Sequence, residues 1–136
     1  MISNLRCDKF NFENEYYILA FITNRCNYKC WYCYNKNEVL KDLNLDDLYV
    51  YIKKIQNCTR RRIILNFIGG EPTCHKKLLQ FCTNIYDNNI SIEIITNFSN
   101  NVDFFKKFPD NVKFTVSFHA QCADVNDFVF KCIELK

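Results

Sequence analysis

The sequence has 136 residues, of which 49% are hydrophobic and 24% are charged, as in an ordinary globular protein of one domain. The net charge of +3 is too small to indicate nucleic acid binding, and no apolar run approaches the roughly 18 residues that a membrane span needs. Residues 1–15 lack the apolar core of a secretory signal. We therefore expect a cytoplasmic protein with a single domain over residues 1–136, in which residues 1–15 form an N-terminal extension.

Four short apolar runs, rich in β-branched and aromatic residues, are typical of buried strands. They are Tyr16–Thr23, Arg62–Ile68, Ser91–Thr96 and Val112–Phe118. A helical pattern follows each run, at residues 45–55, 78–86, 104–108 and 125–133. Asn44 and Asp124 are suited to cap the first and last of these helices. The repeated alternation of strand and helix predicts an α/β fold with a parallel sheet of about four strand–helix units.

Nine cysteines are many for this length, and without a secretory signal they indicate metal or redox chemistry rather than disulfides. Cys26, Cys30 and Cys33 follow the first predicted strand with the spacing Cys-x3-Cys-x2-Cys. Three thiolates from one loop can hold three corners of an iron–sulfur cube and leave the fourth iron open. We expect the other cysteines to be buried, inert thiols, with an auxiliary cluster as the alternative; they are Cys7, Cys58, Cys74, Cys82, Cys122 and Cys132.

A structural zinc site is the alternative metal centre, and it needs four closed ligands. The sequence has no second Cys-x2-Cys pair, and the cysteine segment holds the bulky Trp31 and Tyr32, so an iron–sulfur cluster is favoured. A fourth zinc ligand would have to come from Cys7, Cys58, Cys74 or His75.

The second predicted strand is followed by the only two glycines of the chain, Gly69 and Gly70, and then by Glu71 and Pro72. Adjacent glycines permit positive φ and close approach of a ligand to the backbone. Pro72 is suited to the first turn of the next helix. The alternative interpretation is a tight turn with an exposed carboxylate.

The segments CNYKCWYC and GGEP together resemble the cysteine motif and the second motif of the radical S-adenosylmethionine (radical SAM) superfamily. The resemblance implies a 4Fe–4S cluster, S-adenosylmethionine as cosubstrate, and an incomplete barrel of six strand–helix units. The motifs cover residues 16 to about 119, and four units precede the last residue of the sequence. No glycine follows position 70, so the family's fifth-strand motif is absent.

The resemblance also implies roles for individual residues. Cys26, Cys30 and Cys33 would hold the cluster, whose open iron would chelate the amine and carboxylate of the methionine moiety. Glu71 and the backbone of Gly69 and Gly70 would bind the amino group. Further cofactor contacts would come from Tyr32 at the adenine, from Ser117 at the ribose, and from Asn97 and His119.

The function implied is reductive cleavage of S-adenosylmethionine to methionine and a 5′-deoxyadenosyl radical, which abstracts hydrogen from a substrate. The substrate and the catalytic residues that act on it are not evident from the sequence, although a peptide is preferred. An external electron donor is needed. A second copy or a completing subunit is expected, because two strands of the barrel are missing. A cluster-binding module without independent catalysis is the alternative.

Overall fold

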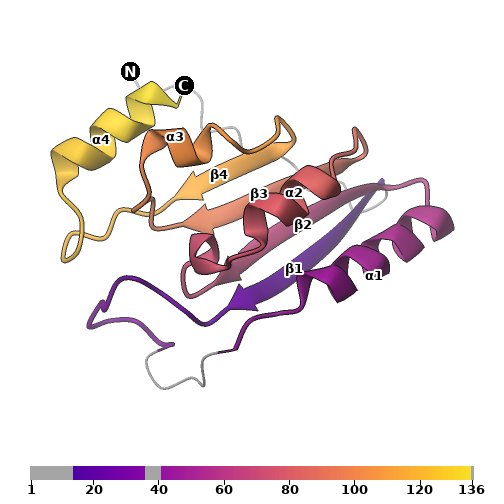
Figure 1. Cartoon of the computed structure of the whole chain (residues 1–136), viewed down its shortest axis with the longest axis horizontal. Coiled ribbons are helices and arrows are strands. Elements are labelled where there is room, and N and C mark those ends of the chain that lie inside the picture. The colour runs from indigo at the N-terminus through magenta and orange to yellow at the C-terminus, as the bar shows by residue number, and fades with distance from the viewer. Residues whose placement is uncertain (1–13, 36–40, 136) are drawn as a thin grey trace.

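The structure is a computed structural model, and it describes residues 14–35 and 41–135. One parallel sheet has its strands in the order of the chain, β1-β2-β3-β4, and helices alternate with the strands (Figure 1). The elements are β1 (Glu15–Thr23), α1 (Leu45–Cys58), β2 (Arg62–Gly69), η1 (Pro72–Cys74), α2 (Leu78–Asn84), β3 (Ile90–Thr96), α3 (Val102–Phe105), β4 (Val112–Val116) and α4 (Val125–Glu134). The prediction of an α/β fold with four strand–helix units is confirmed. Each crossover moves the next strand one place in the same direction, as in part of a parallel barrel.

The predicted helix caps lie where the sequence indicates. The side chain of Asn44 accepts a hydrogen bond from the Asp46 amide at the start of α1, and the carboxylate of Asp124 accepts from two amides at the start of α4. Such caps satisfy backbone donors that have no partner inside the helix.

Some details differ from the prediction. Helix α2 begins at Leu78 as predicted, but Pro72 lies in a separate 3-10 turn, η1, and not in its first turn. Helix α3 spans Val102–Phe105, not residues 104–108. The fourth strand ends at Val116 and not at Phe118, because the chain turns after Ser117 into the loop before α4.

Helices α1 and α2 cover one face of the sheet (Figure 1). The alternate residues of β2 and β3 that point to these helices are fully buried, among them Leu65, Phe67 and Ile92. The opposite face is less covered, since Leu19, Phe21 and Ile95 are 63%, 53% and 40% exposed. Parallel sheets are normally covered on both faces, so this second face is suited to a further contact.

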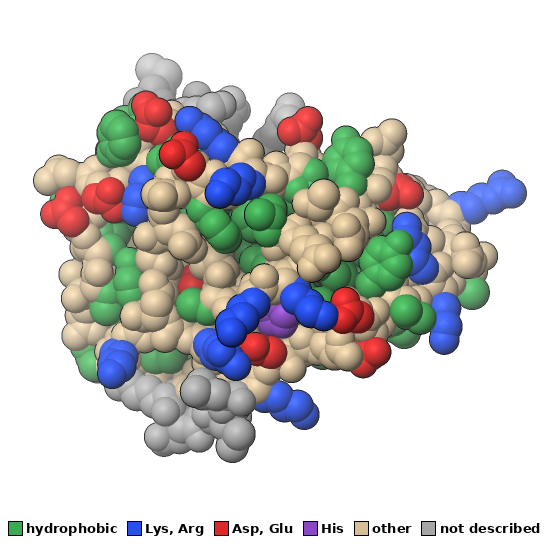
Figure 2. Space-filling model, in the orientation of Figure 1, with side chains coloured by type: hydrophobic (Ala, Val, Ile, Leu, Met, Phe, Trp, Pro, Cys, Tyr) green, Lys and Arg blue, Asp and Glu red, His purple; other side chains and the backbone are tan. Residues whose placement is uncertain are grey.

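Charged groups of both signs share the surface. On the face drawn in Figure 2, lysine and arginine side chains lie among aspartate and glutamate side chains. Among the described residues, no helix is both long and apolar enough to cross a membrane.

Cys82 lies on α2 in the hydrophobic core, fully buried, and this burial raises the pKa of its thiol to about 12. Because the thiolate is the nucleophile, we expect Cys82 to resist alkylation in the folded protein at pH 8 and to react on unfolding. Site-resolved mass spectrometry after a short iodoacetamide pulse measures this. The exposed Cys58 is the internal control, and equal labelling of both residues would contradict the prediction.

The expectation of buried thiols holds for Cys82 but is wrong for Cys58 and Cys122, which are exposed. Cys74 and Cys132 are half-buried. Cys7 lies outside the described residues.

Candidate functional site

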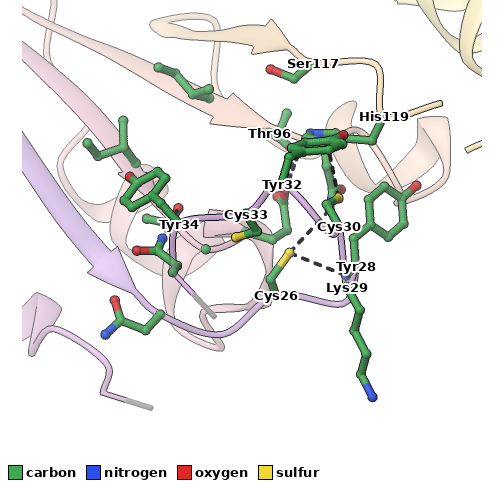
Figure 3. A pocket seen from close by; sticks show the side chains of 18 residues that line it. Cys26, Tyr28, Lys29, Cys30, Tyr32, Cys33, Tyr34, Thr96, Ser117 and His119 are labelled. Atoms are coloured by element: carbon green, nitrogen blue, oxygen red, sulfur yellow. Dashed lines mark hydrogen bonds between the residues drawn. The ribbon is translucent and has the colours of Figure 1, made fainter. Parts of the chain in front are cut away.

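A cavity of about 730 Å³ opens at the carboxyl ends of the strands. This is the end of a parallel α/β sheet where ligands bind, and the volume is in the range of small-molecule sites. The structure brings all the predicted site residues to this one cavity; those lining it are Cys26, Cys30, Tyr32, Cys33, Gly69, Gly70, Glu71, Asn97, Ser117 and His119. Figure 3 shows the cysteine loop, residues 24–35, running along the cavity below the end of β4.

The glycine pair is required by the chain's own backbone. A Cβ atom on Gly69 would lie 2.2 Å from the carbonyl oxygen of Thr23, and one on Gly70 would lie 2.3 Å from that of Arg25. Gly69 also has a φ of +142°, which side chains rarely allow. The amides of Gly70 and Glu71 donate to the same two carbonyls, at 2.8 and 2.7 Å. The Gly-Gly-Glu segment therefore anchors the start of the cysteine loop.

We expect Gly70→Ala to lower the free energy of unfolding by about 1–3 kcal/mol, because the new methyl group meets a rigid backbone carbonyl. Iron content after reconstitution should fall as well, since the start of the cysteine loop must move. Urea unfolding and iron analysis measure the two effects. An unchanged unfolding midpoint would show that the close approach is tolerated.

A second anchor holds the cysteine loop from the other side. The Thr23 hydroxyl donates to Asp42 Oδ1 at 2.6 Å and accepts from the Arg25 amide at 3.1 Å. The guanidinium of Arg25 pairs with the same carboxylate, with Nε 3.3 Å from Oδ1. The loop therefore leaves β1 in a fixed direction.

Glu71 is buried, with 1% of its surface exposed, and is held by four hydrogen bonds. Oε1 accepts from the amide and hydroxyl of Thr73 and from the hydroxyl of Thr96, and Oε2 accepts from the Asn97 amide at 2.6 Å. The interpretation of Glu71 as an exposed charge in a turn is thus wrong. A carboxylate oxygen can accept two hydrogen bonds. Among the described residues, Oε2 accepts one, from the Asn97 amide, so it can accept a second from a ligand in the cavity.

The three cysteines of the loop share the cavity, but their sulfur atoms do not converge. Among residues 14–35 and 41–135, no three Cys, His or acidic side chains are arranged to hold a metal ion. The Sγ atom of Cys30 lies 3.5 Å from His119 Nδ1, whereas Cys26 Sγ accepts from the Tyr28 amide (Figure 3). A 4Fe–4S cluster with one iron free of protein ligands is held by three thiolates. The three cysteines are the right ligands for such a cluster, and they lie in one loop at one cavity.

Burial raises the pKa of the Cys26 thiol, and the negative charge of Glu71 adds to this rise, although the Tyr28 amide opposes it. Cysteine binds metals as the thiolate. Loading a metal at Cys26 must therefore displace a proton, which the positive charge of iron favours.

His75 is unsuited to zinc. Its Nε2 donates to the Leu43 carbonyl at 3.0 Å, and its Nδ1 accepts from the Lys77 amide at 3.2 Å. With both ring nitrogens engaged, the side chain serves to hold the segment before α1 against the start of α2.

Asn97 joins three parts of the site. Its backbone amide donates a hydrogen bond to Glu71 Oε2. Its side-chain Nδ2 donates to Asn27 Oδ1 at 2.9 Å and lies 3.9 Å from Cys26 Sγ. The next residue, Phe98, has a φ of +60°, which is a strained conformation for an aromatic residue. Lys131 of α4 is hydrogen-bonded to the Phe98 carbonyl and helps to hold this turn.

Ser117 and His119 lie in the β4–α4 loop, residues 117–124, and not in the strand as expected. The Ser117 amide still donates to the Thr96 carbonyl, which keeps its side chain at the cavity. His119 Nδ1 is hydrogen-bonded to the Tyr32 hydroxyl at 2.8 Å, and the two rings stack 6° from parallel. His119 therefore positions an aromatic ring of the cysteine loop.

Sequence reasoning missed several residues at this cavity. Tyr28, Lys29 and Thr96 line it, and Cys122 Sγ lies 3.9 Å from Cys30 Sγ. Lys29 and Tyr28 could have been found from their positions between the first two cysteines. Cys122 carried no local signal, because its neighbour in space is 92 positions away.

Comparison with known proteins identifies the family. The family model described as the radical SAM superfamily matches residues 21–128. An uncharacterised protein of Methanocaldococcus jannaschii is 34% identical over 86 residues, covering 60% of this chain and 30% of that protein. A SAM-dependent nucleotide dehydratase of Selenomonas ruminantium is 33% identical over 82 residues, with the same two coverages. One of Fibrobacter sp. is 32% identical over 84 residues, covering 56% of this chain and 25% of that protein.

The chain thus spans 30% or less of the length of each of these three relatives. The family match extends from the end of β1 to α4 and contains both the cysteine loop and the Gly-Gly-Glu-Pro segment. Since this match covers most of the sequence, the chain belongs to the radical SAM superfamily.

Proposed function

We propose that the chain binds a 4Fe–4S cluster through Cys26, Cys30 and Cys33, binds S-adenosylmethionine in the adjoining cavity, and cleaves it. The observation that carries this proposal is the meeting of three loop thiols and the Gly-Gly-Glu segment at one cavity. When bound and reduced, the cluster supplies the electron that breaks the carbon–sulfur bond and yields a 5′-deoxyadenosyl radical. An external donor must deliver that electron.

The chain's own residues supply binding and orientation. Glu71 Oε2, which already accepts a hydrogen bond from the Asn97 amide, would accept a second one from the amino group of the methionine moiety. The amides of Gly70 and Glu71 already donate to the carbonyls of Thr23 and Arg25. The glycine backbone would therefore bind the methionine amino group through its carbonyl oxygens, which accept hydrogen bonds. Tyr32, which is hydrogen-bonded to His119, would pack on the adenine, and Ser117 and Asn97 would offer polar groups to the ribose; all three line the cavity.

For the substrate, the names of two relatives favour a nucleotide. The matched proteins of Selenomonas ruminantium and Fibrobacter sp. are SAM-dependent nucleotide dehydratases. Lys29 lines the cavity from the cysteine loop and could attract an anionic group. A peptide substrate remains the expectation from the sequence, and assays with nucleotides and with peptides in parallel discriminate between the two.

The test of the proposed function is 5′-deoxyadenosine formation from S-adenosylmethionine, measured anaerobically with a strong reductant on the reconstituted protein. The Cys30→Ala variant should form none, and the Cys58→Ala variant, altered at an exposed thiol outside the cavity, should match the wild type. Four irons without cleavage would indicate a cluster-binding module. Zinc that iron cannot replace would refute the proposal.

We further expect self-association, or dependence on a partner, for cleavage. Among the described residues, β1 and β4 are the outer strands of the sheet; residues 41–43 pair only with the carboxyl end of β1, and the remaining open edges favour pairing with another chain. The exposed Leu19 and Phe21 lie near one of these edges, on β1. Light scattering, combined with cleavage assays over a dilution series, measures this. A stable monomer with concentration-independent specific activity would contradict it.

A further inference from the structure

Cys30 and Cys122 are neighbours across the site, with their Sγ atoms 3.9 Å apart. Cys30 lies in the cysteine loop and is buried, whereas Cys122 lies in the β4–α4 loop and is exposed. The pair therefore presents one thiol to solvent and keeps the other inside. Of the described cysteines outside the loop, Cys122 is the one whose sulfur contacts that of a proposed cluster ligand.

Contacts on both sides of the pair hold the two loops together. The Trp31 amide donates a hydrogen bond to Gln121 Oε1 at 3.1 Å. Trp31 follows Cys30 in the sequence, and Gln121 precedes Cys122. His119 reaches across to Cys30 and to the Tyr32 hydroxyl, at 3.5 and 2.8 Å. The closeness of the two sulfur atoms thus follows from the docking of two loops and not from one side-chain rotamer.

We propose that Cys30 and Cys122 form a reversible disulfide that withdraws Cys30 from the cluster site. The sulfur atoms would have to approach from 3.9 Å to about 2.05 Å, and both belong to loops rather than to the sheet. The exposed Cys122 is the residue that a small disulfide can reach first.

The oxidant is a low-molecular-weight disulfide such as oxidised glutathione. The thiolate of Cys122 attacks it, forms a mixed disulfide and releases one glutathione thiolate. The thiolate of Cys30 then attacks the sulfur of Cys122 and releases the second. Two protein thiols lose two electrons and two protons, and one glutathione disulfide becomes two thiols.

The consequence for the cluster rests on the proposed function. A sulfur atom in a disulfide is no longer a thiolate, so Cys30 can be bonded to Cys122 or to iron, but not to both. Under reducing conditions the pair stays open and the cluster can load. Under oxidising conditions the disulfide protects Cys30 of cluster-free protein from irreversible oxidation to sulfinic acid.

The test begins with cluster-free protein treated with oxidised glutathione without reductant, alkylated and digested with trypsin. We expect the peptide of residues 30–36 to be joined to that of residues 114–131. Fragmentation must place the bond on Cys30, because the first peptide also contains Cys33. The crosslink should vanish in Cys122→Ser and persist in Cys58→Ser, whose substituted thiol is also exposed.

A second arm uses cluster-loaded protein under the same treatment, where the crosslink should fall about tenfold or more, because iron occupies Cys30. Glutathione on Cys122 without the crosslink, or a crosslink of Cys122 to another cysteine, would overturn the proposal. Because the first arm needs no cluster, failure of the proposed function leaves its result interpretable. A crosslink that forms equally in cluster-loaded protein would refute the withdrawal of Cys30.

Discussion

Replacing any one of Cys26, Cys30 and Cys33 by alanine should reduce the iron bound after anaerobic reconstitution from about four per chain to nearly none. The three residues lie in one loop at one cavity, and we infer that each provides one of three thiolates. A cube held by two thiolates has two open irons and is easily lost to solvent. Iron and sulfide analysis, together with the visible absorption of the reconstituted protein, measures the loss.

Cys58→Ala and Cys132→Ala are the matched controls, and both should retain the full iron content. Cys58 is exposed at the end of α1 and Cys132 is half-buried on α4, and neither lines the cavity. Retention of four irons by one of the three loop variants would show that another cysteine replaces the missing ligand. Cys122 would then be the first residue to examine, because its sulfur lies beside that of Cys30.

The strands and helix starts were predictable from the sequence because their signals are local. Alternating buried residues such as Leu65 and Phe67 mark β2, and capping side chains such as Asn44 mark the start of a helix. The end of β4 was not predictable in this way. Beyond Val116 polar and apolar residues keep alternating, as in a strand, but the amides of Cys122 and Ala123 bond back to the His119 carbonyl and form a turn.

The candidate site was predictable in its residues but not in its contacts. The glycine pair indicated a close approach, yet the group that approaches is the backbone of Thr23 and Arg25, which precedes the first cysteine. The burial of Glu71 depends on β3, which is distant in sequence. Such contacts are set by how loops pack at the end of the sheet, and residue spacing along the chain does not encode them.

Glu71→Gln tests the second largest effect, which is the loss of S-adenosylmethionine binding. If Oε2 accepts a hydrogen bond from the methionine amino group, replacing the carboxylate by an amide should weaken binding by about ten- to a hundredfold, equivalent to about 1.5–3 kcal/mol. The iron content should be unchanged, because Glu71 is not a proposed cluster ligand. Equilibrium binding to the cluster-loaded protein, measured without oxygen, gives the affinity.

The same substitution should also destabilise the fold. The amide group of glutamine cannot accept at both ends, so either the Asn97 amide or the Thr73 and Thr96 donors lose their acceptor in a buried place. Each buried donor left without a partner costs about 1–3 kcal/mol, which urea unfolding of the cluster-free protein measures. Binding must accordingly be compared at temperatures where both proteins are fully folded.

Glu93→Gln is the matched control for Glu71→Gln. Glu93 is a half-buried carboxylate in β3 that accepts a hydrogen bond from Thr115, and it does not line the cavity. We expect this variant to keep the affinity for S-adenosylmethionine, since it removes a charge from the same sheet without touching the ammonium position. If Glu71→Gln loses stability but binds as tightly as Glu93→Gln, then Glu71 acts only by tying η1 to β3. The amino group of the methionine moiety would then be held by the glycine carbonyls and the cluster, without help from Glu71.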